Sequence, residues 1–355
     1  MLGVELELTM SFRTIAVLLF MLLAFASATA AQERYPALDK EPACQTLVPT
    51  AAGGPRPQNP DVIVLRFLGV ANYELAHRDN VILLDAGIDT LSWWEQSGVT
   101  PEMMTKDVDA ILIGHAHGEH LWDAPYIGEK TGALVVADPI AMRWIRGTGR
   151  VDDKKMATVK GLGGEKFPFN GFTVEAVLGH HNIVPDDYMR KDRAAAAAIT
   201  LQPGLTPEQQ VHDRRLGGMV PTTPEERERL IKEGTIAYFF TFDNGFTMFY
   251  TDSAGPTTDP ERKIMQGKPK IDVGFIPYYG GELAIPITME YVRLFKPDVM
   301  LPTHHDGHRN RMLDMPLGPL GLAIRNEFPK TKAIAPLLRT PVCINTATRE
   351  VYVGN

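Results

Sequence analysis

Cysteine is scarce in this chain, and the two that occur stand far apart. Cys44 and Cys343 are the only cysteines among 355 residues, which makes a structural zinc site built from pairs of cysteine ligands a poor fit. In an oxidising compartment the two thiols would be able to pair and tie an N-terminal arm to the C-terminal segment. The sequence leaves open whether they pair or stay unpaired, because it does not show their distance.

The chain also lacks an excess of positive charge. It has 36 Lys and Arg against 43 Asp and Glu, for a formal net charge of −7. Proteins that bind nucleic acids usually carry a basic patch or stripe. We therefore expect a small-molecule substrate and no nucleic-acid partner, while the oligomeric state stays open.

An apolar run long enough to span a bilayer comfortably is missing near the N-terminus. The run Ile15–Phe25 is short for a span. It follows Arg13 and precedes the small residues 26–31, which together are typical of a secretory signal peptide. We expect residues 1–31 to be such a peptide and the mature chain to be periplasmic or secreted, with no stable membrane anchor. An uncleaved anchor is the alternative.

The remaining sequence is that of a globular protein with strands and interspersed helices. It is 44% hydrophobic and 22% charged, which is ordinary for a chain with a real core. Residues 32–60 are predicted to form an extended arm and residues 61–355 one domain. Residues 182–235 are predicted to be an inserted loop and helix, either a lid or a solvated excursion. Strands are expected at 62–69, 72–77, 80–85, 108–113, 133–137, 172–178, 236–242, 246–250, 271–277 and 299–303. The alternation favours an α/β fold of the αββα sandwich type, with two mixed sheets face to face and helices outside.

Histidine clusters follow several of these predicted strands. Eight of the ten histidines lie in three clusters, and a carboxylate follows a fourth strand. Loops at the ends of core strands are where sites are usually built, and imidazole and carboxylate are ligands for divalent metals. The candidates are His115, His117, Glu119 and His120, then His180 and His181, then Asp252, then His304, His305 and His308. His77 and His212 fall outside the pattern and are interpreted as surface or turn residues.

The first cluster is suited to two adjacent metals. His115 and His117 are two residues apart, so an extended chain points both to the same side. Gly118 then allows the chain to turn, so Glu119 and His120 are free to aim elsewhere. In the second cluster, the apolar phase of the preceding strand favours His180 over His181 as the residue that points to the same side as that strand's apolar positions.

These motifs resemble the metallo-β-lactamase superfamily, whose signature is His-x-His-x-Asp-His, then a lone His, a bridging Asp and a final His. The corresponding residues are His115 to His120, His180 or His181, Asp252 and His304. Residues 67–69 followed by 82–87 look like the opening hairpin of the family. The segments 269–281 and 296–304 look like the late portion of the branch that contains ascorbate-phosphate lactonase and phospholipase-D-like enzymes. The resemblance covers about residues 61–310, except the insertion.

The resemblance implies two bound metals and a hydrolytic reaction. His115, His117 and His180 would hold one ion, Glu119, His120 and His304 the other, and Asp252 would bridge them. The ions implied are divalent zinc, with iron or manganese as alternatives. A water shared by the two metals would act as hydroxide on an ester, lactone, amide or phosphodiester, with Glu119 or Asp252 steering its proton. His305 and His308 are candidates for supporting or substrate contacts, and Asp85 for orienting a ligand.

Glu119 departs from the family, which usually has Asp there, and its longer side chain keeps other readings open. A carboxylate-rich site also suits a diiron oxidoreductase of the same fold. Against that reading, the chain shows no flavin or electron-transfer module. A secreted metal-binding protein without catalysis is a third possibility, for which broken ligand positions would be the sign, and every position is filled.

Overall fold

The structure, a computed structural model, describes residues 35–88, 98–181, 235–253, 255–278, 284–306 and 317–354. The expected signal peptide, nearly all of the expected insertion and His308 lie outside these ranges. The described strands form two sheets. The first contains β1 (Val62–Gly69), β2 (Asn72–His77), β3 (Asn80–Leu84), β4 (Ala110–Leu112), β5 (Leu134–Ala137), β6 (Met156–Thr158), β14 (Pro341–Asn345) and β15 (Val351–Val353). The second contains β7 (Gly163–Phe169), β8 (Phe172–Gly179), β9 (Thr235–Phe242), β10 (Thr247–Tyr250), β11 (Val273–Pro277), β12 (Val299–Thr303) and β13 (Lys332–Ala333).

Both sheets are mixed, as expected. The first runs β15-β14-β1-β2-β3-β4-β5-β6 and changes from antiparallel to parallel pairing at β3. The second runs β13-β12-β11-β10-β9-β8-β7 and is parallel from β10 to β13. Because β9 is antiparallel to both of its neighbours, β8 and β10 point the same way. The carboxyl ends of β8, β10 and β12 therefore meet at one edge of the second sheet.

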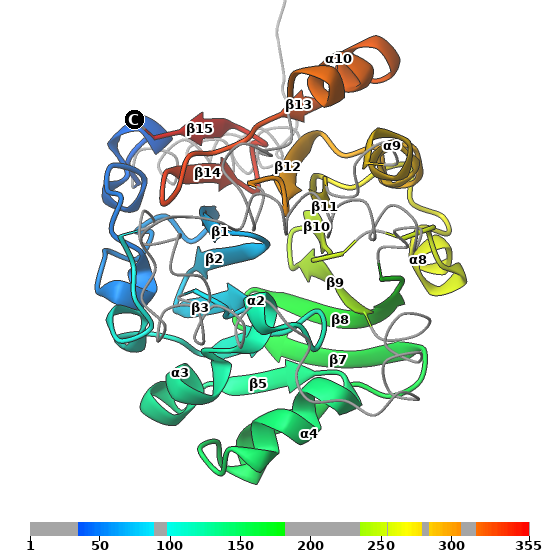
Figure 1. Ribbon diagram of the computed structural model, residues 1–355. Coiled ribbons are helices and arrows are strands. Elements are labelled where there is room, and N and C mark those ends of the chain that lie inside the picture. Colours follow the sequence, from blue (N-terminus) through cyan, green and yellow to red (C-terminus); the bar gives the residue numbers. More distant parts are fainter. Residues whose placement is uncertain are drawn as a thin grey trace, which may run out of the picture.

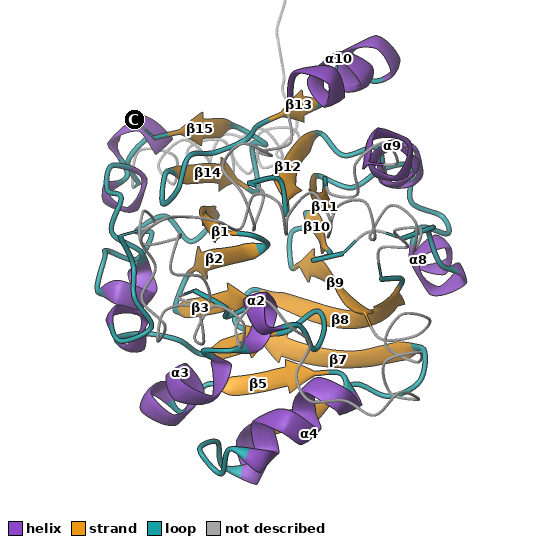
Figure 2. Cartoon of the chain, viewed as in Figure 1, coloured by secondary structure: helices purple, strands orange, loops and turns teal. Residues whose placement is uncertain are grey.

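The hydrophobic core is divided into three layers, which makes the architecture an αββα sandwich (Figures 1 and 2). The middle layer lies between the sheets, where alternate residues of β1 (Ile63, Leu65 and Phe67) meet aromatic residues of β9. Helices α2 (Gly118–Leu121), α3 (Ala124–Thr131) and α4 (Pro139–Gly147) lie on the first sheet's side. Helices α8 (Asp259–Ile264), α9 (Ala284–Phe295) and α10 (Leu317–Glu327) lie on the second sheet's side.

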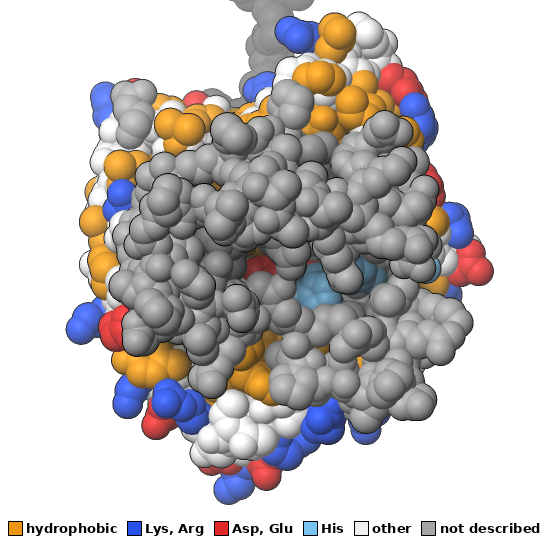
Figure 3. Space-filling view, viewed as in Figure 1, with side chains coloured by type: hydrophobic (Ala, Val, Ile, Leu, Met, Phe, Trp, Pro, Cys, Tyr) orange, Lys and Arg blue, Asp and Glu red, His pale blue; other side chains and the backbone are white. Residues whose placement is uncertain are grey.

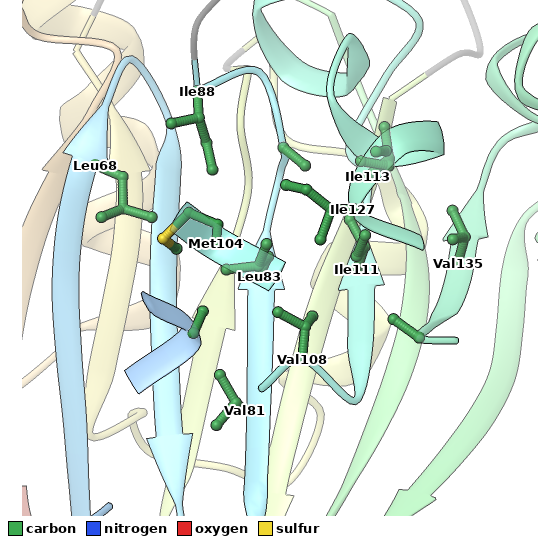
Figure 4. Packing of buried hydrophobic residues seen from close by; sticks show 14 of the residues in the cluster. Leu68, Val81, Leu83, Ile88, Met104, Val108, Ile111, Ile113, Ile127 and Val135 are labelled. Atoms are coloured by element: carbon green, nitrogen blue, oxygen red, sulfur yellow. The ribbon is translucent and has the colours of Figure 1, made fainter. Parts of the chain in front are cut away.

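The outer face of the first sheet is covered partly by the N-terminal arm. The arm was expected to be extended, but it contains three short 3-10 helices, η1 (Leu38–Lys40), η2 (Pro42–Cys44) and η3 (Thr50–Ala52). A further one, η5 (Met103–Thr105), places Met104 against Leu83 and Leu68 (Figure 4). The arm is compact because the sheet offers it buried partners.

A buried ion pair holds the arm to the sheet. Nη1 of Arg66 lies 2.8 Å from Oε1 of Glu74, and neither side chain is exposed. The Glu74 carboxylate also accepts hydrogen bonds from the backbone N–H groups of Thr50 and Ala51, at 2.9 and 2.7 Å. Arg66 donates to the carbonyl of Ala43 at 2.6 Å. The two buried charges thus compensate each other, as buried charges must, and their hydrogen bonds to the arm fix it to the sheet.

The question of the cysteines is resolved by a disulfide. Cys44 of η2 and Cys343 of β14 are bonded, with Cα atoms 6.0 Å apart and a separation of 299 residues along the chain. Both are fully buried. The bond therefore joins the arm to a strand near the C-terminus.

Most of the predicted strands are confirmed, and β1 and β2 match their predicted bounds. Helices α8 and α10 were not predicted. His77, interpreted from the sequence as a surface or turn residue, is only 2% exposed and lies between Phe172 and Phe242. Among the described residues, no helix has the length and apolar character needed to cross a membrane.

Helix α8 begins with a buried carboxyl group whose ionisation is unfavourable. Thr258 and Glu261 form a capping box, and Glu261 is fully buried next to Tyr291 of α9. Burial outweighs these hydrogen bonds and raises the pKa of Glu261 to about 7. Because the unfolded chain has the ordinary, lower value, the folded state binds more protons between these two pKa values, and stability falls as pH rises through that window.

We predict that Glu261→Gln stabilises the protein above pH 7 by about 2–3 kcal/mol and has little effect near pH 4. Glutamine keeps an oxygen for the Thr258 N–H and carries no charge. Urea denaturation at pH 4.5, 6 and 8 would measure this. An equal effect at all three values would contradict the assigned cause.

Candidate metal centre

Four strand ends bring the predicted residues to one place. The loop after β4 carries His115 and His117 and leads into α2, which carries Glu119 and His120. The other contributions follow β8, β10 and β12. A backbone hydrogen bond joins the two sides of the sandwich here, from the N–H of Ile236 in β9 to the carbonyl of Gly114 after β4, at 2.7 Å.

The side chains form three overlapping groups, within each of which the potential ligand atoms lie within 4.8 Å of one another. These groups are His115, His117 and His181; His115, His120 and Asp252; and Glu119, His120 and His304. The first and third have no member in common, and the middle one joins them. Asp252 thus lies between two potential metal sites, as the resemblance implies for a bridging ligand. Histidine side chains are visible near the centre of the face shown in Figure 3, with acidic atoms beside them.

The preference for His180 is not supported by the geometry, because His181 occupies the position. The ring of His181 lies 4.8 Å from that of His115 and 4.9 Å from that of His117, centroid to centroid. Nδ1 of His180 instead lies 2.8 Å from the carbonyl oxygen of His181. The phase argument fails because β8 ends at Gly179 and the chain leaves the strand before either histidine.

Asp85 orients His120, as was anticipated. Its Oδ2 lies 2.7 Å from Nδ1 of His120 and accepts the Tyr250 hydroxyl at 2.6 Å. Its Oδ1 accepts the N–H of Gly114 at 2.9 Å. A carboxylate only accepts hydrogen bonds, so Nδ1 of His120 carries a proton and Nε2 is the nitrogen left to face a metal. This arrangement is common for metal-binding histidines.

The donor atoms left over fit a metal. Nε2 of His115, Nε2 of His120 and Oδ1 of Asp252 are buried and have no hydrogen-bond partner among the described residues. Buried polar atoms of this kind are costly unless something compensates them. Three of them in one cluster of imidazole and carboxylate groups are the donor set that a divalent cation takes.

The electrostatics point the same way. Burial and then the neighbouring histidines hold the pKa of His115 well below its usual value, so its ring is neutral. Burial and the charge of Asp85 raise the pKa of Asp252 well above its usual range. For His120 burial lowers the pKa, but Asp85 and Asp252 outweigh it and raise it to about 9. A cation would stabilise both carboxylates as anions and displace the proton of His120.

A close approach of the Asp252 side chain explains the glycine that precedes His115. A Cβ added at Gly114 would lie 2.1 Å from Cγ of Asp252, a distance no side chain tolerates. Asp252 therefore reaches the histidines only because residue 114 has no side chain.

His305, the neighbour of His304, is buried and stacks on Phe67 with ring centroids 4.9 Å apart.

Sequence reasoning missed several supporting residues. Asn72 donates to the carbonyl of Glu119, and Tyr250 donates to Asp85, which holds His120. Asp306, two residues after His304, accepts the N–H of Val70. Tyr250 is the last residue of a predicted strand, and Asn72 the first of another. Neither position carries a local signal for such a role.

Comparison with known proteins gives a family match in the part of the chain that holds the first cluster. Residues 65–195 match the model of the metallo-beta-lactamase superfamily. A UPF0173 metal-dependent hydrolase of Thermococcus onnurineus is 38% identical over 76 residues, which are 21% of this chain and 31% of that protein. A second, from Pyrococcus horikoshii, is 40% identical over 76 residues, or 21% and 32% of the two chains. The match thus spans about a third of these curated relatives.

Two solved structures share the fold over most of the chain. Igni18, a metallo hydrolase from Ignicoccus hospitalis, has a TM-score of 0.52 and 15% identity, covering 80% of this chain and 98% of its own. An isothiocyanate hydrolase from Delia radicum gut bacteria has a TM-score of 0.51 and 15% identity, covering 80% and 99%. At such identity the likeness concerns the fold. Residues 65–195 are thus similar in sequence to the metallo-beta-lactamase superfamily, and most of the chain shares the fold of these two solved structures.

Proposed function

We propose that the protein is a hydrolase that uses two divalent metal ions, with zinc as the first candidate. The observation that carries the proposal is the position of Asp252 between two separate potential ligand groups. A single structural zinc takes four ligands, and seven side chains converge here: His115, His117, Glu119, His120, His181, Asp252 and His304.

When bound, two such ions would supply a water with its pKa lowered to roughly 7, the nucleophile that hydrolysis needs. The chain's own residues have separable roles. Asp85 keeps the His120 ring in one tautomer and orientation. We propose Asp252 and Glu119 as the carboxylates that accept or steer a proton. His117 and His181 are only partly buried, so the first group is the one nearer to solvent and to an incoming substrate.

The substrate class that we propose is an ester, lactone, amide or phosphodiester. All four present an electrophilic centre with an oxygen that gains charge as the nucleophile adds. The names of the relatives support hydrolysis, since those of two partial sequence matches and two fold neighbours include the word hydrolase.

We also propose that the protein is exported and works in the periplasm or outside the cell. A disulfide between Cys44 and Cys343 supports this, because such bonds persist mainly in oxidising compartments. The signal-like residues 1–31 support it from the sequence.

Metal analysis and a substrate panel test the function together. We expect two zinc ions per chain, and metal-dependent turnover of at least one of a lactone, a β-lactam, a carboxylic ester and a phosphodiester. Removal of the metal with a chelator should abolish turnover, and added zinc should restore it. Two irons with an oxygen-dependent product would instead support the diiron oxidoreductase, whose specific attraction is the carboxylate of Glu119. A metal-loaded chain without turnover of any substrate would favour a binding protein.

A further inference from the structure

One short turn contacts groups that hold Glu119, His120 and His304 in place. Residues 69–72 join β1 to β2 at the edge where the site lies. Val70 has a φ of 55°, in the left-handed region that β-branched residues rarely adopt. Such strain persists only where the surroundings fix the conformation. The contacts of the turn show what fixes it.

Asn72 holds the backbone of Glu119. Its side chain is fully buried. Oδ1 accepts the N–H of Gly87 at 2.8 Å, and Nδ2 donates to the carbonyl of Glu119 at 3.2 Å. The amide orientation is determined by the partners, since Gly87 N–H only donates and the carbonyl only accepts. A Cβ on Gly87 would lie 2.1 Å from the carbonyl oxygen of Glu119. Asn72 thus connects two backbone segments already in contact and sets the point from which the Glu119 side chain departs.

Val70 holds the segment of His304. Its carbonyl accepts the N–H of His304, and its own N–H donates to Oδ2 of Asp306 at 2.9 Å. His304 also has a left-handed backbone, with φ of 56°. Two strained residues therefore brace one another, and the Asp306 carboxylate closes the connection.

The turn reaches His120 through two side chains. The Tyr250 hydroxyl donates its single proton to Oδ2 of Asp85 at 2.6 Å, and the carbonyl oxygen of Ala71 contacts the same hydroxyl at 3.1 Å without a second full hydrogen bond. Asp85 in turn holds Nδ1 of His120. Each member of the group is therefore linked to residues 69–72, although the three come from two distant parts of the chain.

We propose that residues 69–72 are the common support of the second metal site, with Asn72 and Asp306 as positioning residues for it. This inference rests on the proposed function, because it concerns one of its two metal sites. It requires that a substitution in the turn weakens the binding of the ion held by Glu119, His120 and His304. The ion held by His115, His117 and His181 should be affected much less.

The test is the affinity of each site for zinc in the full chain, measured by competition with a chromophoric chelator. Asn72→Ala is expected to lower the affinity for the second ion about 10- to 100-fold, which is the usual effect of removing a group that orients metal ligands. The first ion should bind as in the wild type. Asn80→Ala is the matched control. Asn80 is a buried asparagine in the same hairpin, and it donates to the carbonyls of His77 and Asn170 at the end remote from the site. It should lower stability and leave both affinities unchanged.

A second pair of variants covers the case in which Asn72→Ala does not fold. Asp306→Ala should lower the affinity for the second ion. Asp306→Asn should keep most of that affinity, because the Val70 N–H needs only an oxygen acceptor. The inference about the turn would be overturned if folded Asn72→Ala or Asp306→Ala bound the second ion with wild-type affinity. It would also be overturned if Asn72→Ala and Asn80→Ala lost zinc affinity equally. Neither result would affect the proposed function. A wild-type chain that binds fewer than two ions would overturn the proposed function as well.

Discussion

Replacing His120 with alanine is expected to reduce the metal content from two ions to about one and to lower hydrolysis at least about 100-fold. His120 belongs to two of the three potential ligand groups. Its loss removes a ligand of the second ion and leaves the buried carboxylates of Asp85 and Asp252 without their shared partner. Even loss of a group that merely orients a ligand costs about 10- to 100-fold in metal affinity, so loss of the ligand should cost more. Elemental analysis and initial rates on the same preparation measure both effects.

His77→Ala is the matched control for this experiment. His77 is equally buried in β2, and its Nδ1 lies 3.0 Å from the carbonyl oxygen of Val62, away from the metal centre. The cavity left by its ring should destabilise the fold by roughly 2 kcal/mol or more and leave two ions bound. If His77→Ala loses metal to the same extent, the effect at His120 is general instability. If His120→Ala keeps both ions and its full rate, the site is misassigned.

The strands were predictable because their signal is local. In β1 every residue is buried, and an apolar run of that length, interrupted only by Arg66, is typical of a strand covered on both faces. Helix α8 was missed although it has a capping box, since it is only six residues long. The compact arm was missed for a different reason. Its shape depends on the buried carboxylate of Glu74, to which the backbone N–H groups of Thr50 and Ala51 donate. Such a contact has no counterpart in local sequence.

The candidate metal centre was predictable as a set of residues, but its geometry was less predictable. Histidine is rare and was concentrated after strands, so the strand ends identified the cluster. The choice between His180 and His181 failed because it assumed that β8 continues, whereas the chain leaves the strand after Gly179. There Gly255 N–H binds the carbonyl of His180 at 2.9 Å. The direction of a side chain just beyond a strand depends on such tertiary contacts. The role of Asn72 could not be predicted for the same reason, since its partners are backbone groups that only the fold brings near it.

Removal of the disulfide is expected to have the largest effect on stability. The bond joins residues separated by 299 positions. By the chain-entropy relation, closing a loop of that size destabilises the unfolded state by about 6 kcal/mol. The double variant Cys44→Ala/Cys343→Ala should therefore unfold at much lower urea concentration and melt roughly 10 °C below the oxidised wild type. Part of the effect will be a small cavity, because both side chains are fully buried.

The wild type refolded in the presence of a reductant separates the two contributions, because it keeps both sulfur atoms and loses only the bond. It should be nearly as unstable as the double variant, and both should still bind two metal ions at low temperature, since arm and site are held by different contacts. Arg66 and Glu74 remain to dock the arm in either case. Equal stability of oxidised and reduced wild type would mean that this ion pair suffices, and it would remove one of the two supports for export. A large difference would mean that the chain reaches its full stability only where the bond can form, as expected of a protein that acts outside the reducing cytoplasm.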